Sequence, residues 1–256
     1  MSRFSAVEQN VEELHELCGR AKAGTVLKKV LQEVCGVLDR YRGGHIVIAP
    51  ASGQAHTLCV YDKRTHLPIA YKVETYTGVE HLVHELIHVC VNDAYGRDFV
   101  NYRVQLPPDV EREIPERKYR HGIPTNGYER IGMFANCEAA KTINAALHQK
   151  ARQLQALAEK DKFLKKFQEG HLQASDYVAS LFNGSSSQPW KEFDTYTTQV
   201  LVLLHLWRKA KKIPEAFFTG KSTFYKELKQ VVDQTHTQRI HARQSNVWRN
   251  WRDRRR

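Results

Sequence analysis

The sequence lacks the features of several large protein classes. No apolar stretch is long enough to cross a bilayer, and the best one, Val200 to Trp207, spans only about two helical turns and contains His205. The first residues lead into an acidic segment without an apolar core, so no secretory signal peptide is expected. We therefore expect a protein made in the cytoplasm. If it acts in a target or host cell, it leaves by a leaderless route.

Cysteines are few and widely scattered. The five cysteines form no CxxC pair and no cluster with histidine, which argues against a structural zinc site of the finger or ribbon type. Their odd number and their positions among apolar residues indicate buried free thiols. This cysteine usage is typical of a protein made in a reducing compartment.

The composition is that of a folded, strongly basic protein. The chain has 256 residues, 41% of them hydrophobic and 26% charged, with a net charge of +11. Seven arginines occur between Arg239 and Arg256, with Trp248 and Trp251 among them. Such a tail is able to contact a polyanion, either a nucleic acid or an anionic membrane surface. It is equally typical of a solvated helix end.

The segment from His84 to His88 reads His-Glu-Leu-Ile-His and is the most informative motif of the chain. A helix places residues i and i+4 on one face, so His84 and His88 are able to bind one zinc ion together. Glu85 would project beside the metal as a general base. The alternative is a pair of ordinary histidines on a helix surface.

The residues around this motif favour a helix. Apolar residues recur at helical spacing from Val79 to Cys90. Thr77 and Glu80 have the spacing of a capping box, which predicts Thr77 as the N-cap. The segment from Asn92 to Gly96 supplies stop signals for the end of the helix.

The rest of the chain predicts an α+β protein, mostly helical, with a small mixed sheet before the HExxH helix. Pro68 favours an edge position for the third strand. The clearest later break is the segment 183–189, which we expect to separate a metallopeptidase domain, residues 1–183, from a helical C-terminal region with the basic tail, residues 184–256. The expected helices and strands before the motif are Ala6–Cys18, Thr25–Leu38, His45–Ala49, Thr57–Tyr61 and Leu67–Thr75.

A catalytic zinc ion usually has three protein ligands and a water, so His84 and His88 need a third protein ligand. Glu129 stands at the head of an expected helix, and Glu138 follows among small residues that allow close helix packing. His121 and His148 are further candidates. The residues alone leave these alternatives open.

Three segments resemble the gluzincin metallopeptidases of the bacterial secreted effector and toxin type, in particular NleD-like effectors. They are HELIHVCVNDAYG from His84, TNGYERIG from Thr125 and TINAAL from Thr142. The resemblance implies a zincin-like fold and Glu129 as the third zinc ligand, with Asn144 matching the asparagine that follows in the effector pattern. The arginine expected soon after that asparagine is missing between Ala145 and His148.

The resulting prediction is a zinc endopeptidase that hydrolyses a peptide bond in a protein substrate. Glu85 would accept a proton from water and return it to the leaving amine. The developing oxyanion needs a second donor. Tyr119, His121 and Tyr128 are candidates because they flank Glu129 and carry groups that can donate.

Other functions remain open at this point. One is a polyanion-binding protein that uses the Arg/Trp tail, in which the HExxH motif is incidental. Another is a zinc-dependent regulator that cleaves a partner transcription factor, which shares the chemistry and differs only in substrate.

Overall fold

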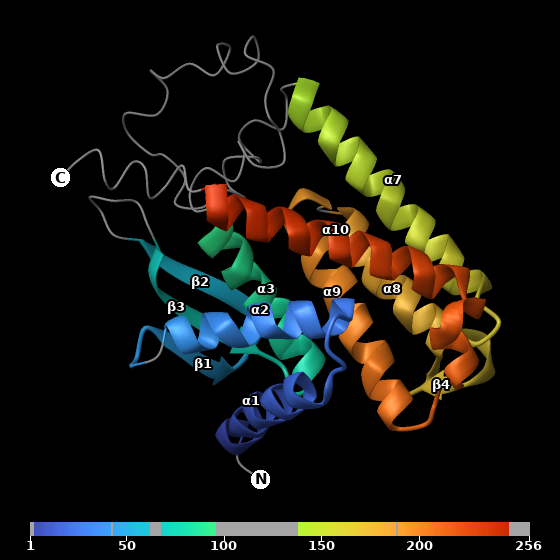
Figure 1. Cartoon of the computed structure of the whole chain (residues 1–256), viewed down its shortest axis with the longest axis horizontal. Helices are drawn as coiled ribbons and strands as arrows, with labels where there is room; N and C mark the ends of the chain where they lie inside the picture. The colour runs from blue at the N-terminus through green and yellow to red at the C-terminus, as the bar shows by residue number, and fades with distance from the viewer. Residues whose placement is uncertain (1–2, 42, 62–67, 96–137, 188, 246–256) are drawn as a thin grey trace.

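The computed structural model describes residues 3–41, 43–61, 68–95, 138–187 and 189–245 (Figure 1). These ranges are mostly helical with a small mixed sheet, as the sequence predicts. The helices are α1 (Arg3–Arg20), α2 (Val26–Arg40), α3 (Val79–Tyr95), α7 (Glu138–Lys160), α8 (Ala174–Ser187), α9 (Pro189–Lys209) and α10 (Thr223–Ser245). The strands are β1 (Ile46–Pro50), β2 (His56–Tyr61) and β3 (Pro68–Thr75), and a short hairpin joins β4 (Gln168–Glu169) to β5 (Leu172–Gln173).

The three-stranded sheet has the order β1-β3-β2, with β1 parallel and β2 antiparallel to β3. The expectation that the segment 67–75 is an edge strand is therefore wrong, because β3 is the central strand. Pro68 is tolerated because it is the first residue of β3, opposite Tyr61 at a register shift, whereas pairing with β1 begins only at Tyr71. A proline at the start of a strand removes no hydrogen bond from the interior of the ladder.

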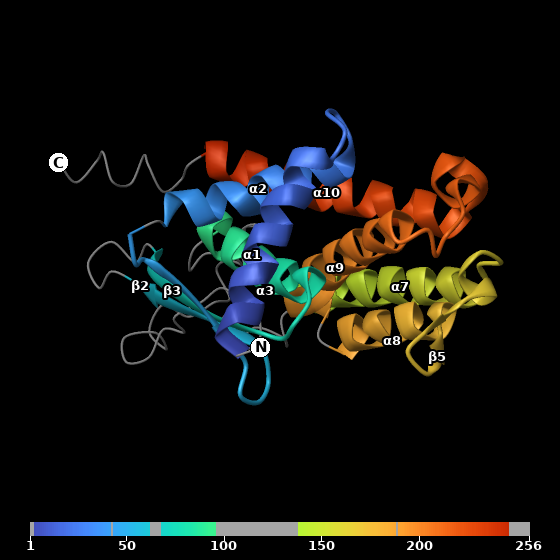
Figure 2. The same ribbon diagram turned by 90° about the horizontal axis from the view of Figure 1, so that it is seen from below.

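The two faces of this sheet differ in their environment. Tyr71 and Val73 are buried in the same core as α3. Val47, Leu58 and Val60 are exposed on the described chain. Figures 1 and 2 show the sheet at one end of the molecule and the helices α7 to α10 at the other, with α3 between them.

Helix α3 is the central element of the described fold. It packs against β2, β3, α1, α2, α9 and α10. An α-helix that is apolar around most of its circumference is a buried helix. The side chains from Leu82 to Val91 are buried accordingly, with His84 only partly buried. The HExxH motif thus lies on a helix of the hydrophobic core rather than on a surface helix.

The N-terminus of α3 lies one residue later than the capping box predicts. Gly78 is the N-cap, because its carbonyl accepts the first helical hydrogen bond from the Leu82 amide at 3.2 Å. Its φ of 117° is strained for any residue with a Cβ, and an added Cβ would lie 2.8 Å from Glu80 Oε1. The Gly78 amide donates to Asn10 Oδ1 at 3.3 Å, which ties the start of α3 to α1.

The segment 183–189, where the sequence predicts a break between two domains, is largely helical. Helix α8 continues to Ser187 and α9 begins at Pro189, where the fixed φ of proline suits the first helical turn. Gly184 lets the two helices approach, since an added Cβ would lie 3.1 Å from the Tyr196 hydroxyl. The hydrophobic core contains residues from both sides of this segment. The proposed domain division at residue 183 stays a prediction.

The C-terminal end of α10 is held by buried ion pairs. Arg239 is completely buried, donates to Glu33 on α2 at 2.8 Å and lies 3.4 Å from Asp194 on α9. Arg243 donates to Glu33 at 2.8 Å and to the Cys90 carbonyl of α3 at 3.1 Å. These contacts join four helices and bind two of the seven C-terminal arginines into the core.

No helix of the described ranges combines the length and the apolar character that a membrane span needs.

Candidate metal centre

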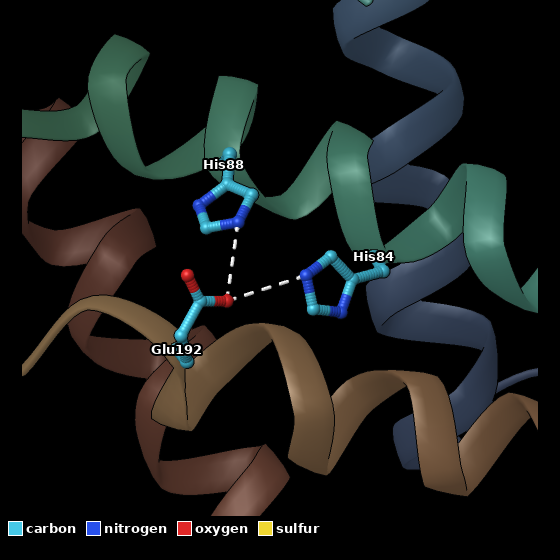
Figure 3. A group of neighbouring side chains, drawn as sticks. All are labelled: His84, His88 and Glu192. Carbon is cyan, nitrogen blue, oxygen red and sulfur yellow. Dashed lines mark ion pairs between the residues drawn. The ribbon is translucent and has the colours of Figure 1, made fainter. Parts of the chain in front are cut away.

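Three potential metal ligands converge from two helices. His84 and His88 project from one face of α3, and Glu192 reaches them from the first turn of α9 (Figure 3). Glu192 Oε2 lies 3.3 Å from His84 Nε2 and 3.5 Å from His88 Nε2. One ligand atom from each residue lies within 4.8 Å of the others, so the group could hold a metal ion.

The local structure of α9 fixes the position of Glu192. Pro189 starts the helix, so Glu192 falls in its first turn and close to its N-terminus. The Thr195 hydroxyl lies 2.7 Å from the Glu192 carbonyl and 3.2 Å from its carboxylate Oε2. The carboxylate is therefore held from its own helix as well as by the imidazoles.

The electrostatics of the group favour an ionised carboxylate. Burial alone would raise the pKa of Glu192, but the two imidazoles that hydrogen-bond to it outweigh this and hold its pKa well below the usual range. An ionised carboxylate and two imidazole nitrogens form a donor set that suits a divalent transition metal. The residues present therefore fit a metal ion at this position.

The outer nitrogen of His84 is also held. His84 Nδ1 lies 2.9 Å from Gln199 Oε1, and Gln199 Nε2 lies 3.1 Å from His81 Nδ1. Gln199 is only 2% exposed. Burial lowers the pKa of His81, and the nearby His84 lowers it further, so His81 is neutral at pH 7.

Glu85 lies on the same helix and is 4% exposed. The Thr57 hydroxyl on strand β2 lies 2.8 Å from Glu85 Oε2 and 3.0 Å from the Glu85 carbonyl. One carboxylate oxygen of Glu85 is thus held from the edge strand of the sheet. This contact fixes the side chain that the sequence predicts as the general base.

Tyr196 packs against the group from α9. Its ring lies 4.7 Å from that of His84, centroid to centroid, in an edge-to-face arrangement. Burial raises the pKa of Tyr196, and the carboxylates of Glu192 and Glu85 raise it further, so the phenol is protonated at neutral pH. Its hydroxyl lies beside Gly184 of α8.

The structure brings together part of the site expected from the sequence. His84 and His88 lie together as predicted, with Glu85 on the same helix. The candidate ligand Glu129 and the candidate donors Tyr119, His121 and Tyr128 lie outside the described residues, and their roles stay predictions. Of the remaining ligand candidates, Glu138 begins α7, and His148 on that helix is not part of the three-residue group.

Glu192 is the candidate ligand that the sequence analysis missed. The candidate third ligands named from the sequence all lie between His121 and His148, close to the motif along the chain. The sequence of helix α9, which is otherwise rich in valine, leucine and tryptophan, contains a pattern that points to this residue. Polar residues recur there at helical spacing, at positions 192, 195, 196 and 199. Such a stripe indicates a polar site facing a neighbouring element.

The basic tail is smaller than its sequence indicates. Arg239 and Arg243 neutralise Glu33 in the core and are not part of a free cationic surface. The segment 246–256, with the other arginines and both tail tryptophans, lies outside the described residues. A polyanion contact through that segment stays a prediction.

Comparisons with known proteins identify no relative. No family model, no curated protein and no solved structure matches the chain. The effector resemblance of three short segments therefore rests on those segments alone.

Proposed function

We propose that the protein is a zinc-dependent endopeptidase that hydrolyses a peptide bond in a protein substrate. The observation that carries the proposal is the convergence of His84, His88 and Glu192 beside the HExxH glutamate. Two imidazoles and one carboxylate are the protein ligands of many hydrolytic zinc sites. Such a set leaves a fourth position for water or substrate. Glu192, rather than the Glu129 implied by the effector resemblance, supplies the third ligand in this proposal.

When bound, zinc would act as a Lewis acid that activates water and polarises the scissile carbonyl. Glu85 acts as the general base: it takes a proton from the attacking water and delivers it to the leaving nitrogen. The Thr57 hydroxyl holds Glu85 Oε2, which leaves the other carboxylate oxygen for the proton transfer. The buried position of Glu85 supports this role, because a fixed base loses little entropy when the reaction begins.

The class of substrate follows from the motif and from charge. HExxH carboxylates act on peptide bonds in metallopeptidases. The net charge of +11 favours an acidic protein or an acidic surface as the target. Delivery to a host cell, as the effector resemblance implies, is part of this proposal.

The proposal is tested by a cleavage screen on a cell proteome. The native protein, loaded with zinc, is compared with Glu85→Gln, which keeps the size of the side chain and removes the base. New N-termini are identified by mass spectrometry. We expect a small set of cleavage sites with the native protein and none with Glu85→Gln or after chelation.

A matched control is Glu159→Gln, an exposed glutamate of α7 that bonds to Gln155. It should cleave like the native protein. A screen in which Glu85→Gln produces the same N-termini as the native protein would contradict the assigned role.

A further inference from the structure

A chain of side chains leads away from His84, on the side opposite Glu192. His84 Nδ1 faces Gln199 Oε1 at 2.9 Å, and the amide nitrogen of Gln199 faces His81 Nδ1 at 3.1 Å. His81 Nε2 in turn lies 3.7 Å from Glu80 Oε1. Gln199 and Glu192 lie on the same helix, two turns apart. Helix α9 therefore supplies both a ligand and a contact to another ligand.

The direction of these hydrogen bonds decides which nitrogen of His84 can bind a metal. A neutral imidazole carries its proton on one nitrogen and a lone pair on the other. The amide oxygen of Gln199 only accepts, so His84 Nδ1 must carry the proton when it faces that oxygen. Nε2, the atom that faces Glu192, is then the nitrogen left for a metal ion, which would replace the proton that Nε2 shares with the carboxylate.

The far end of the chain sets the orientation of the amide. Glu80 Oε1, 3.7 Å from His81 Nε2, is beyond hydrogen-bond distance, but a carboxylate on that side favours a proton on Nε2. His81 then has its lone pair on Nδ1 and accepts from the Gln199 amide nitrogen. The reversed amide would instead donate to His84 Nδ1 and place the His84 proton on Nε2, where a metal must bind. The His81 ring is held in place by an edge-to-face contact with Tyr76, with ring centroids 5.7 Å apart.

We propose that Gln199, oriented by His81, is a positioning residue that holds His84 in the Nδ1–H form required for metal binding. The inference rests on the metal site of the proposed function but not on peptidase activity. Groups that orient a ligating histidine typically contribute about 10- to 100-fold to metal affinity. Loss of the Gln199 oxygen should weaken zinc binding by a factor of this order.

The test uses the full chain, first stripped of metal and labelled with ¹⁵N-histidine. Long-range ¹H–¹⁵N spectra report the tautomer of each ring, and the His84 signals are those lost in His84→Ala. Zinc affinity is then measured by competition with a chromophoric chelator. The variants are Gln199→Leu, which removes the acceptor, and Gln199→Glu, which keeps an acceptor at the same place.

Thr198→Val is the matched control on the same buried helix, because the Thr198 hydroxyl has no hydrogen-bond partner among the described residues. We expect a proton on His84 Nδ1 in the native chain and in Gln199→Glu. Zinc affinity should fall about 10- to 100-fold in Gln199→Leu and stay within a few-fold of native in Gln199→Glu and Thr198→Val.

Should Gln199→Leu fail to fold, His81→Phe tests the same chain, since it keeps an aromatic ring and removes the nitrogen that orients the amide. It should shift the His84 tautomer toward a mixture. A native chain in which His84 Nδ1 carries no proton would overturn the inference. So would native zinc affinity in a folded Gln199→Leu, or an unchanged tautomer in His81→Phe. If the His84 proton and the zinc affinities are as expected but the protein has no peptidase activity, the proposed function is wrong and this inference still holds.

Discussion

Glu33 is a buried carboxylate and Glu192 a partly buried one, and their partners differ in charge. Glu33 is surrounded by the guanidinium groups of Arg239 and Arg243, with His236 as a third neighbour. Glu192 is surrounded by two imidazoles, which are cationic only when protonated. The Glu33 cluster is neutralised by its own side chains. The Glu192 cluster needs a further cation, either protons or a metal ion.

The position of each cluster fits this difference. The Glu33 side chain has no exposed surface, and it joins α2 to α10. The side chains of His84, His88 and Glu192 retain 10–19% of their exposure. A cluster that is fully closed stabilises the fold, whereas one that is partly open is able to exchange an ion with solvent. We infer that the first is structural and the second is functional.

The largest effect is expected from breaking the structural cluster. Arg239→Met leaves Glu33 buried with fewer cations, and loss of one partner of a buried ion pair typically costs about 3–5 kcal/mol. The free energy of unfolding is measured in urea with a chelator present, so that no metal contributes. Lys29→Met is the matched control, because Lys29 pairs with Asp233 between the same two helices at the surface. It should cost at most about 1 kcal/mol. Equal losses in the two variants would contradict the structural role of Glu33.

The second effect concerns the functional cluster. Free zinc at 100 times its dissociation constant should raise the free energy of unfolding of the native chain by about 2.7 kcal/mol. Glu192→Gln should lose most of this gain, while Glu129→Gln should keep it. Thermal or urea unfolding with and without zinc measures the difference. If zinc stabilises Glu192→Gln but not Glu129→Gln, the third ligand is Glu129, as the effector resemblance implies.

The third effect is the pH dependence of the structural cluster, which the comparison of the native chain with Glu33→Gln isolates. Burial raises the pKa of Glu33, but Arg239, His236 and Arg243 outweigh it and hold the pKa far below the ordinary value of 4.5. A lowered pKa in the folded state gives stabilisation that is complete above the unfolded value and is lost as the pH falls below it. The stability difference between native and Glu33→Gln should therefore be constant above about pH 5 and shrink on the order of 1 kcal/mol per pH unit below 4.5. Urea unfolding between pH 3 and about 7, with chelator, measures it. A difference that shrinks already between pH 7 and about 5 would show that another group titrates.

The smallest effect concerns Thr57, which touches Glu85 but not the metal ligands. Thr57→Val removes one hydroxyl and should cost about 1 kcal/mol of unfolding free energy. Zinc affinity should not change, and Thr57→Ser should restore the stability. A loss of zinc affinity in Thr57→Val would show that Glu85 is coupled to the ligands.

The sequence predicted the local elements better than their arrangement. Helices α2 and α3 and strands β1 to β3 follow from hydrophobic spacing and turn residues, which act over a few positions. The central position of β3 did not follow, because strand order depends on pairing between distant segments. Pro68 led to the wrong prediction of an edge strand, because the sequence did not show that this proline is the first residue of the strand.

The same limit applies to the metal centre. His84 and His88 are one helical turn apart, so their juxtaposition is a local property of the sequence. Glu192 and Gln199 come from a helix far along the chain, and their approach to α3 depends on packing between α3 and α9. The buried role of Arg239 was equally hidden, since a run of arginines ordinarily indicates a solvated segment.

The most direct test of the account is the zinc content of the full chain after equilibration with zinc and gel filtration. We expect about one zinc ion per chain in the native protein and in Glu129→Ala, and close to none in His88→Ala or Glu192→Ala. A native chain that binds no zinc, or a folded Glu192→Ala that still retains it, would contradict the metal centre described.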